Sequence, residues 1–377
     1  MPPEMPSDMP SNDDFEVTVP CATPDEFIAA LSPRNDRYCS LHPRGWVYRG
    51  VADDQRHDLT PSALREESKG LTEITGQAIR TNNDQCRAER NALTRFLQIS
   101  DSIGLHVPED TQELRSILAV SVDLPDQWPP PSVLSLMALA QHHRVPTRLL
   151  DWSRHPLKAA WFAAKGAVES EDKSGLLSVW ALCVDEIRVL HNLPLPFTIV
   201  TAPSATNSNL RAQEGVFTAA KPIKPDTLEV DRRPFDKVLK ASIAEWDLRV
   251  PGPWFYRVTL QRAQADELFF ALAFEGVTRA TLFPNFDGVV QEMRDEAHLF
   301  WTPNSPGLRR IEKHLKGFHV SHRSSIILSE LLATWFPPPP PPSFSMSTRD
   351  LPSKRERYRI SPAPQNSTFN FRSIPPT

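Results

Sequence analysis

The chain has 377 residues, and its 42 Lys and Arg against 46 Asp and Glu give a formal net charge of -4. This balance excludes a chain-wide basic field for nucleic acid, although a local basic groove stays open. No apolar run approaches the roughly 18 residues of a membrane span, and the acidic, Pro-rich start predicts no targeting signal. The four Cys, at positions 21, 39, 86 and 183, are too widely spaced for zinc pairs and too few to staple the fold, which predicts a metal-free protein of the reducing cytoplasm.

The first elements predicted along the chain are a helix, a strand and a long helix. Residues 1–20 are expected to be disordered, and the globular part begins near Thr23, which can cap a helix whose first residue is Pro24. Residues 45–51 alternate like a strand. Residues 72–102 contain no Pro and carry apolar side chains at helical spacing, which predicts one long amphipathic helix.

Proline and capping residues divide the middle of the chain. Three prolines at 129–131 precede Ser132, a predicted N-cap of a helix that must end before Pro146. Residues 148–152 are predicted to be extended, with Ser153 as the cap of an Ala-rich helix over 156–165 that Gly166 closes. Residues 174–184 are rich in Leu, Val and Trp and predict a buried strand.

The remaining elements are shorter. Residues 194–203 are broken by Pro, and a charged connector follows the segment 209–219. Strands are predicted over 256–260 and 280–284, and helices over 265–274 and 287–299. A polyproline tract after Trp335 forms an extended helix and no core. We therefore predict a disordered segment 1–20, one globular domain 21–335 with a C-terminal extension, and a Pro-rich disordered tail 336–377.

The segment 138–164, reading ALAQHHRVPTRLLDWSRHPLKAAWFAA, is the most informative part of the sequence. It places His142, His143, Arg148 and Asp151 within ten positions, between apolar helical segments. Polar residues at this density inside an apolar frame indicate either a buried polar network or a functional site. Because adjacent side chains on a helix point to different faces, at most one of the two His is expected to enter a site.

Six motifs follow one another in a recognisable order along the chain: WVYRG at 46–50, LTPSALRE at 59–66, QHHRVPTRLLDWS at 141–153, PLKAAWFAA at 156–164, NLRAQEGVFT at 209–218 and TLFPNFDGV at 281–289. Together they resemble the FRG domain family over roughly residues 23–300. Tyr48 stands where this family usually has Phe, Val51 where Gln is common, and Arg144 where Gly is typical. None of these departures removes a charged residue of the motifs.

The FRG resemblance implies a fold and an activity. Members of the family resemble ADP-ribosyltransferases distantly and are associated with toxin and phage-defence systems. The implied fold is α+β, a single globular domain in which a split, mostly antiparallel sheet surrounded by helices brings the segments of Arg49, Asp151 and Gln213 to one cleft. The implied substrate is NAD. The three motif positions of such enzymes fall on Arg49, on Ser153 and on the Gln213–Glu214 pair.

The chemistry of NAD cleavage gives these residues tasks. The reaction passes through an oxocarbenium-like state, which needs an oriented ribose and favourable charge beside it. Arg49 would clamp a diphosphate or ribose oxygen, Glu214 would accept from the ribose 2′-hydroxyl, and Ser153 would position the ring. The candidate catalytic residues are Arg49, Ser153, Gln213 and Glu214, and the candidate nucleotide-binding residues are Arg49, His142, His143, Arg148, Asp151 and Trp152.

Structural roles stay open for the same side chains. Arg49 could be an ion-pair partner, and the two His could favour a helix end by charge alone. Arg148 and Asp151 could pair with each other or with Arg49 as a buried network. Trp152 could be core. The sequence has no Gly-rich phosphate loop and no nucleophile elbow, which argues against ATP hydrolysis, dehydrogenase chemistry and serine hydrolysis.

Three hypotheses follow. The first is a cytoplasmic ADP-ribosyltransferase that uses NAD to modify a protein or nucleic acid, as a toxin or phage-defence effector that an antitoxin could restrain. The second is a catalytically silent nucleotide-binding or sensing module, whose polyproline tail docks to a partner with an SH3-like or WW-like groove. The third, a nuclease or other hydrolase that uses His142, His143 and Asp151, ranks last.

Overall fold

The computed structural model describes residues 15–38, 45–55, 59–65, 70–120, 127–184, 197–201, 208–221, 229–245, 253–302 and 305–317. The described residues up to Leu315 belong to one compact unit, and a second unit begins at Lys316. The Pro-rich tail 336–377 lies outside the described residues, as does most of the N-terminal segment. Within the described ranges, no helix has the length and apolarity needed to cross a bilayer.

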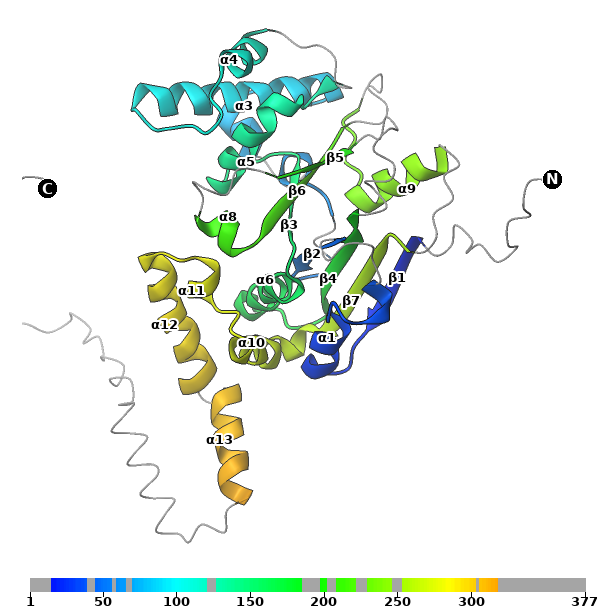
Figure 1. Cartoon of the computed structure of the whole chain (residues 1–377), viewed down its shortest axis with the longest axis vertical. Coiled ribbons are helices and arrows are strands. Elements are labelled where there is room, and N and C mark those ends of the chain that lie inside the picture. The colour runs from blue at the N-terminus through cyan, green and yellow to red at the C-terminus, as the bar shows by residue number, and fades with distance from the viewer. Residues whose placement is uncertain are drawn as a thin grey trace, which may run out of the picture. The chain divides into compact units, whose positions relative to one another are not determined.

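Seven strands of the described chain form one open sheet in the order β1-β7-β4-β2-β3-β6-β5 (Figure 1). β1 and β7 run parallel, and the other neighbouring strands are antiparallel. The predicted α+β class with a mostly antiparallel sheet is therefore confirmed. The strands are β1 Glu16–Pro20, β2 Trp46–Val51, β3 Leu149–Ser153, β4 Leu176–Cys183, β5 Phe197–Val200, β6 Gly215–Ala220 and β7 Phe255–Gln261.

The sheet is split between β2 and β3. These neighbours share the single registered pair Tyr48–Ser153, whereas β2 pairs with β4 along its whole length, from Trp46–Cys183 to Val51–Ser178. β3 pairs with β6 over all its residues, from Leu149–Ala219 to Ser153–Gly215. We call the boundary between β2 and β3 the seam, and it divides the sheet into two well-paired halves.

Side-chain alternation along the strands gives each half its own core on one face of the sheet. Trp46 and Tyr48 of β2 belong to a core with α1, α6 and α10, while Val47 and Val51 point to the opposite face. Ser153 is the registered partner of Tyr48, so the two side chains lie on the same face, and Leu149 shares that face with Ser153. Leu149 nevertheless packs into a separate core with α3, α4 and α5. The opposite face has one core, to which α9 contributes, that includes residues of both halves.

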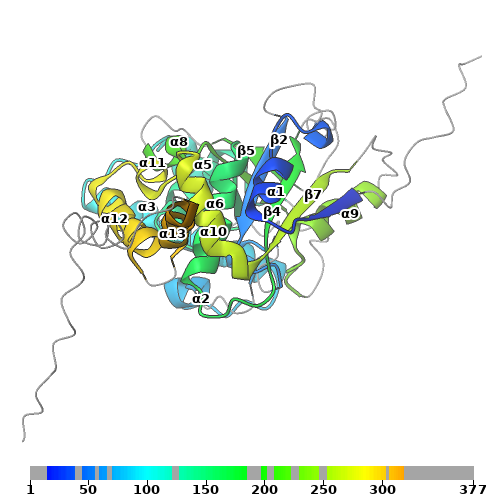
Figure 2. The same cartoon turned by 90° about the horizontal axis from the view of Figure 1, so that it is seen from below.

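The helices of the described residues surround this sheet (Figures 1 and 2). They are α1 Pro24–Ala30, α2 Gly70–Thr75, α3 Asn82–Ser102, α4 Gln112–Ala119, α5 Leu134–His142, α6 Pro156–Glu169, α8 Ser208–Ala212, α9 Phe235–Glu245, α10 Ala265–Phe274, α11 Arg279–Leu282, α12 Phe286–Trp301 and α13 Pro306–Gly317. In Figure 1, α3, α4 and α5 lie by the β3-β6-β5 half, and α6 and α10 lie by the other half.

Local sequence signals account for several helix starts. The hydroxyl of Thr23 accepts from the backbone N–H of Glu26, with Pro24 at the first helical position, as predicted. Thr81 and Asp84 form a reciprocal capping box at the start of α3. The Asn285 side chain caps α12 by accepting from the Gly288 N–H. The predicted helix over 265–274 matches the bounds of α10.

Other local predictions were wrong. The segment 72–102 is interrupted, because α2 ends at Thr75 and Gly76 takes a positive φ of 67°. Gly166 does not close α6, which continues to Glu169. Residues 279–282 form a short helix instead of a strand, because Thr278 caps it in a reciprocal box with Thr281.

Two other elements also begin at residues other than those predicted from the sequence. Ser132 lies inside a short 3₁₀ turn over Pro131–Val133 and does not cap α5. Glu16–Pro20, placed by sequence in the disordered segment 1–20, forms β1 and pairs with β7. The sheet therefore begins before the predicted start of the globular part.

Candidate functional site

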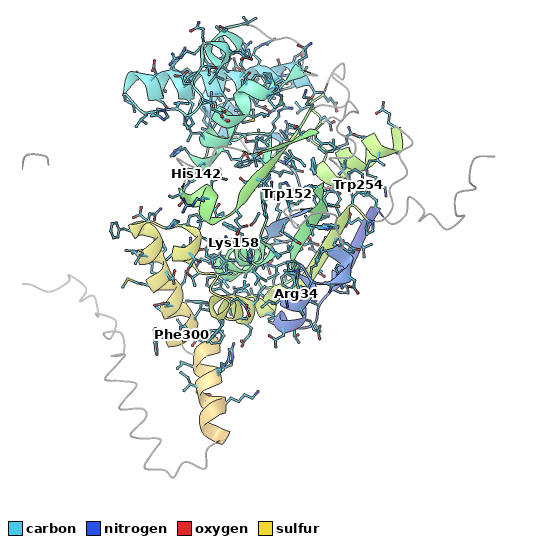
Figure 3. All side chains as sticks on the ribbon, in the orientation of Figure 1. Arg34, His142, Trp152, Lys158, Trp254 and Phe300 are labelled. Atoms are coloured by element: carbon cyan, nitrogen blue, oxygen red, sulfur yellow. The ribbon has the colours of Figure 1, made fainter. Side chains whose placement is uncertain are left out.

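A pocket of about 380 Å³ lies on the face of the sheet where the two cores are separate. Its walls are the end of α5, the strands β3 and β6, and the α8–β6 turn. Its volume falls in the range of small-molecule sites, and about half of its lining residues are polar. Figure 3 labels two of its residues, His142 at the end of α5 and Trp152 on β3. The lining residues used below are Leu139, Gln141, His142, His143, Asp151, Trp152, Gln213 and Phe217.

Asp151 supplies the carboxylate of this pocket. Its side chain is 62% exposed, and the Gln141 Nε2 donates to its Oδ1 at 2.7 Å. The Gln141 Oε1 accepts from the hydroxyl of Thr147, so the amide is held from both ends. The Nη1 of Arg49 lies 3.7 Å from the other carboxylate oxygen. Asp151 is thus oriented by a fixed amide and a nearby cation while its carboxylate stays accessible.

Arg49 occupies the seam. Its Nη1 donates to the backbone carbonyl of Asp151 at 2.8 Å, so the side chain of a β2 residue bridges to β3. The Nε is buried without a hydrogen-bond partner, and burial lowers the pKa of the guanidinium while Asp151 opposes that shift. Arg49 does not line the pocket, so within this structure it acts on the site through Asp151.

Both histidines line the pocket, although at most one was expected there. The reason is that α5 ends at His142, so His143 is the C-cap residue and no longer follows helical side-chain geometry. The two rings meet edge to face at 5.2 Å between centroids, and His143 stacks on Phe96. Burial, and then the neighbouring His143, lower the pKa of His142, while Asp151 opposes the shift.

Ser153 and Glu214 lie outside the pocket lining and are bonded within the protein. The buried Ser153 hydroxyl donates to the Gln213 carbonyl at 2.8 Å and accepts from the His155 N–H at 3.0 Å. Glu214 has a positive φ of 49°, and Lys158 donates to its carboxylate at 2.9 Å. These contacts fix the turn that places Gln213 in the pocket wall, and Figure 3 shows Lys158 at the start of α6.

The side chains of Arg148 and Trp152 are buried and bonded to other parts of the fold. Arg148 is 2% exposed and forms a bidentate pair with Glu89 of α3, at 2.6 and 3.0 Å. Burial alone would lower the pKa of Arg148, but the charge of Glu89 raises it. The Trp152 indole donates to Thr218 at 2.9 Å. The expected pairing of Arg148 with Asp151 was wrong, because Glu89 takes the place of Asp151, whereas the alternative pairing of Asp151 with Arg49 is present.

The structure thus brings His142, His143, Asp151, Trp152 and Gln213 to one pocket, and leaves the other four candidate residues beside it. Sequence reasoning gave no role to Gln141, Lys158 or Glu89. Gln141 and Lys158 lie inside motifs that had been recognised, so a signal was present for them. Glu89 had no such signal, since it lies 59 residues before Arg148 on a helix that reads as ordinary amphipathic sequence.

The fold and site define an α+β protein with a pocket beside the split of a mostly antiparallel sheet. Residues 44–172, about a third of the chain, match the family model of the FRG domain. This match supports the resemblance to that family, over a shorter range than the motifs had suggested. It includes Arg49, His142, Asp151 and Ser153, and ends before Gln213. No curated protein and no solved structure matches the chain.

Proposed function

We propose that the pocket binds NAD and that the protein transfers ADP-ribose from NAD to a macromolecular acceptor. The observation that carries this proposal is the accessible Asp151 carboxylate, which Gln141 and Arg49 orient at the wall of the pocket. Positive charge develops on the ribose when the nicotinamide bond breaks, and a carboxylate that is already oriented beside the ribose stabilises that charge. Asp151 therefore takes the acidic role that motif order had suggested for Glu214.

The reaction can be balanced with the groups in this pocket. The C1′–N bond of NAD breaks, nicotinamide leaves as a neutral molecule with the bonding electrons, and a heteroatom of the acceptor bonds to C1′. The acceptor then loses a proton. His142 is suited to receive that proton or to pass it to solvent, because its lowered pKa keeps the imidazole neutral at pH 7.

The other residues would bind or position the substrate. Gln213 offers an amide to a ribose hydroxyl, and His143 offers a donor to a phosphate oxygen. Arg49 would position Asp151, while Ser153 and Glu214 would hold the turn that carries Gln213. In this proposal Arg148 and Trp152 maintain the strands beneath the site.

The test is transfer of labelled ADP-ribose to components of a cell lysate, from NAD that carries the isotope in its ADP-ribose part. Asp151→Asn, which keeps the shape and removes the charge, should reduce labelling by about a hundredfold. Glu275→Gln, which removes an exposed carboxylate at the end of α10, is the matched control and should label like the wild type. Labelling that survives Asp151→Asn but is lost in Glu214→Gln would overturn the assignment of Asp151.

A catalytically silent nucleotide-binding module is the second candidate function. It is favoured by the fact that Arg49, Ser153 and Glu214 already have hydrogen-bond partners inside the protein. In that case calorimetry would detect NAD or another nucleotide in the pocket with no release of nicotinamide. Removing the polyproline tail, which lies outside the described residues, should then abolish capture of a groove-bearing partner and leave nucleotide affinity unchanged.

The proposed transferase activity predicts an effect on cells, because uncontrolled ADP-ribosylation disables the molecules that it modifies. We propose that the protein acts as a toxin or defence effector. Expression of the wild type should then slow the growth of a host cell, whereas equal expression of Asp151→Asn should not. Equal growth inhibition by both proteins would separate any toxicity from the pocket.

A further inference from the structure

Helix α12 exposes a continuous apolar stripe to solvent. Phe286 is 90% exposed, Val290 48% and Met293 63%, and Ala297 continues the same line. The intervals of four, three and four residues keep these side chains on one side of the helix. In Figures 1 and 2, α12 lies on the outer side of α6 and α10, away from the sheet. The stripe is therefore not part of any core of the described residues.

The opposite side of α12 already anchors it to the protein. Gly288 approaches the backbone of Phe283, Asp295 pairs with Lys165 and Arg279, and Leu299 belongs to the core around α6. A surface helix usually buries its apolar side and presents polar residues to water. Since the other side already holds α12 in place, the exposed apolar stripe needs a different explanation. Contiguous exposed apolar surface commonly marks an interface.

We propose that the stripe pairs with the same stripe of a second copy of this chain, with the two α12 helices antiparallel across a two-fold axis. The four-three-four spacing is that of the contact positions in a helix pair. In the antiparallel arrangement Phe286 lies opposite the partner's Ala297, and Val290 lies opposite the partner's Met293. Each layer then combines a larger with a smaller side chain, and the two-fold axis repeats both layers.

Charges beside the stripe select this occupant and this orientation. Asp287 and Arg294 are seven residues apart, so they lie on the same flank of the helix. Both are exposed, and within the described part of the chain neither forms an ion pair. Antiparallel pairing sets Asp287 beside the partner's Arg294 twice, whereas parallel pairing would set Arg294 beside the partner's Val289 and form no such ion pair. On the other flank Glu296 falls beside the partner's Val289, so no repulsion arises there.

The experiment measures the molecular mass of the full chain by sedimentation equilibrium over a range of protein concentrations. The wild type should dimerise, and Met293→Lys should abolish the dimer by placing a charge in its centre. Asp287→Arg should weaken the dimer about tenfold or more, because two attractive pairs become repulsive. Adding Arg294→Asp to Asp287→Arg should restore the wild-type affinity.

Restoration by the double exchange is specific to the antiparallel two-fold arrangement, and thermal unfolding of each variant verifies that the chain still folds. A chain that remains monomeric at its highest soluble concentration would overturn the proposal. So would a dimer that tolerates Met293→Lys, because its interface then lies elsewhere. A monomer in which a Met293→Cys thiol reacts slowly would show that another occupant covers the stripe, and would also overturn the proposal.

Discussion

At the scale of single residues, the orientation of the accessible Asp151 carboxylate depends on the side chains bonded around it. Gln141 holds one carboxylate oxygen, and Thr147 in turn fixes the orientation of the Gln141 amide. Arg49 contributes a cation and closes the seam with the same guanidinium. A change at any of these three residues would alter the direction of the carboxylate while its chemical identity stays the same.

His142 should make ligand binding depend on pH. Its pKa is lowered from the ordinary value of 6.5, first by burial and then by His143. The ring is thus neutral at pH 7 and becomes cationic as the pH falls below 6.5. A diphosphate prefers the cationic form, so NAD affinity measured by calorimetry should rise as the pH decreases from about 7.5 to about 5.5.

The variant His142→Asn should flatten this dependence, because the asparagine does not titrate. His298→Asn is the control, since His298 pairs with Asp266 outside the pocket. A pH dependence that is unchanged in His142→Asn would assign the titration to another group.

At the scale of elements, the close approach of α6 to β2 depends on Gly50. A Cβ at this position would overlap the Ala159 carbonyl and lie 2.8 Å from the Ala163 backbone nitrogen. Gly50→Ala should therefore force the helix from the strand and lower the free energy of unfolding by about 3 kcal/mol, measured by urea denaturation. Leu105→Ala, at a side chain that is 60% exposed, should change it by no more than about 0.5 kcal/mol. Equal effects of both substitutions would contradict this account.

The elements also show what sequence could and could not predict. Helix starts that depend on a capping side chain could be predicted, as at Thr23 and Pro24, because a cap and its helix are neighbours in the chain. The pocket segment around His142 and Asp151 could be predicted too, since its density of polar residues is a local property of the sequence. Both the Arg148–Glu89 pair and the Lys158–Glu214 pair join positions more than fifty residues apart, and only tertiary packing decides such partners.

Weak local preference explains the strands and helices that sequence analysis missed. β5 lies in a segment broken by Pro, and its pairing with β6 supplies the backbone hydrogen bonds that its own sequence does not predict. α9 lies in what read as a charged connector, but Phe235 and Leu239 bury one side of it in the core on the face opposite Tyr48. In both elements, tertiary burial outweighs a modest intrinsic preference.

At the scale of the whole molecule, the seam should be the weakest line in the sheet. β2 and β3 share one registered pair, and Arg49 bridges the gap. Native-state hydrogen exchange should therefore be at least about tenfold faster for amides facing the seam than for those between β4 and β7. Arg49→Ala should accelerate the seam amides further and leave the β4–β7 ladder unchanged.

A control for this experiment is Arg233→Ala, which breaks an exposed pair with Asp231 away from the seam. It should leave exchange at β2 and β3 at the wild-type rate. Uniform protection across the sheet would mean that the two halves open together, and that Arg49 does not bridge separately stable parts.

The parallel pairing of β1 with β7 has a consequence for synthesis on the ribosome. Glu16 lies beside Phe255, so the first strand emerges 239 residues before its neighbour. At roughly 5–20 residues per second, β1 waits about ten to fifty seconds without its final partner. During that time it is an unpaired strand open to other nascent chains, and Glu16 together with the acidic residues just before it gives this segment the charge that discourages such contacts.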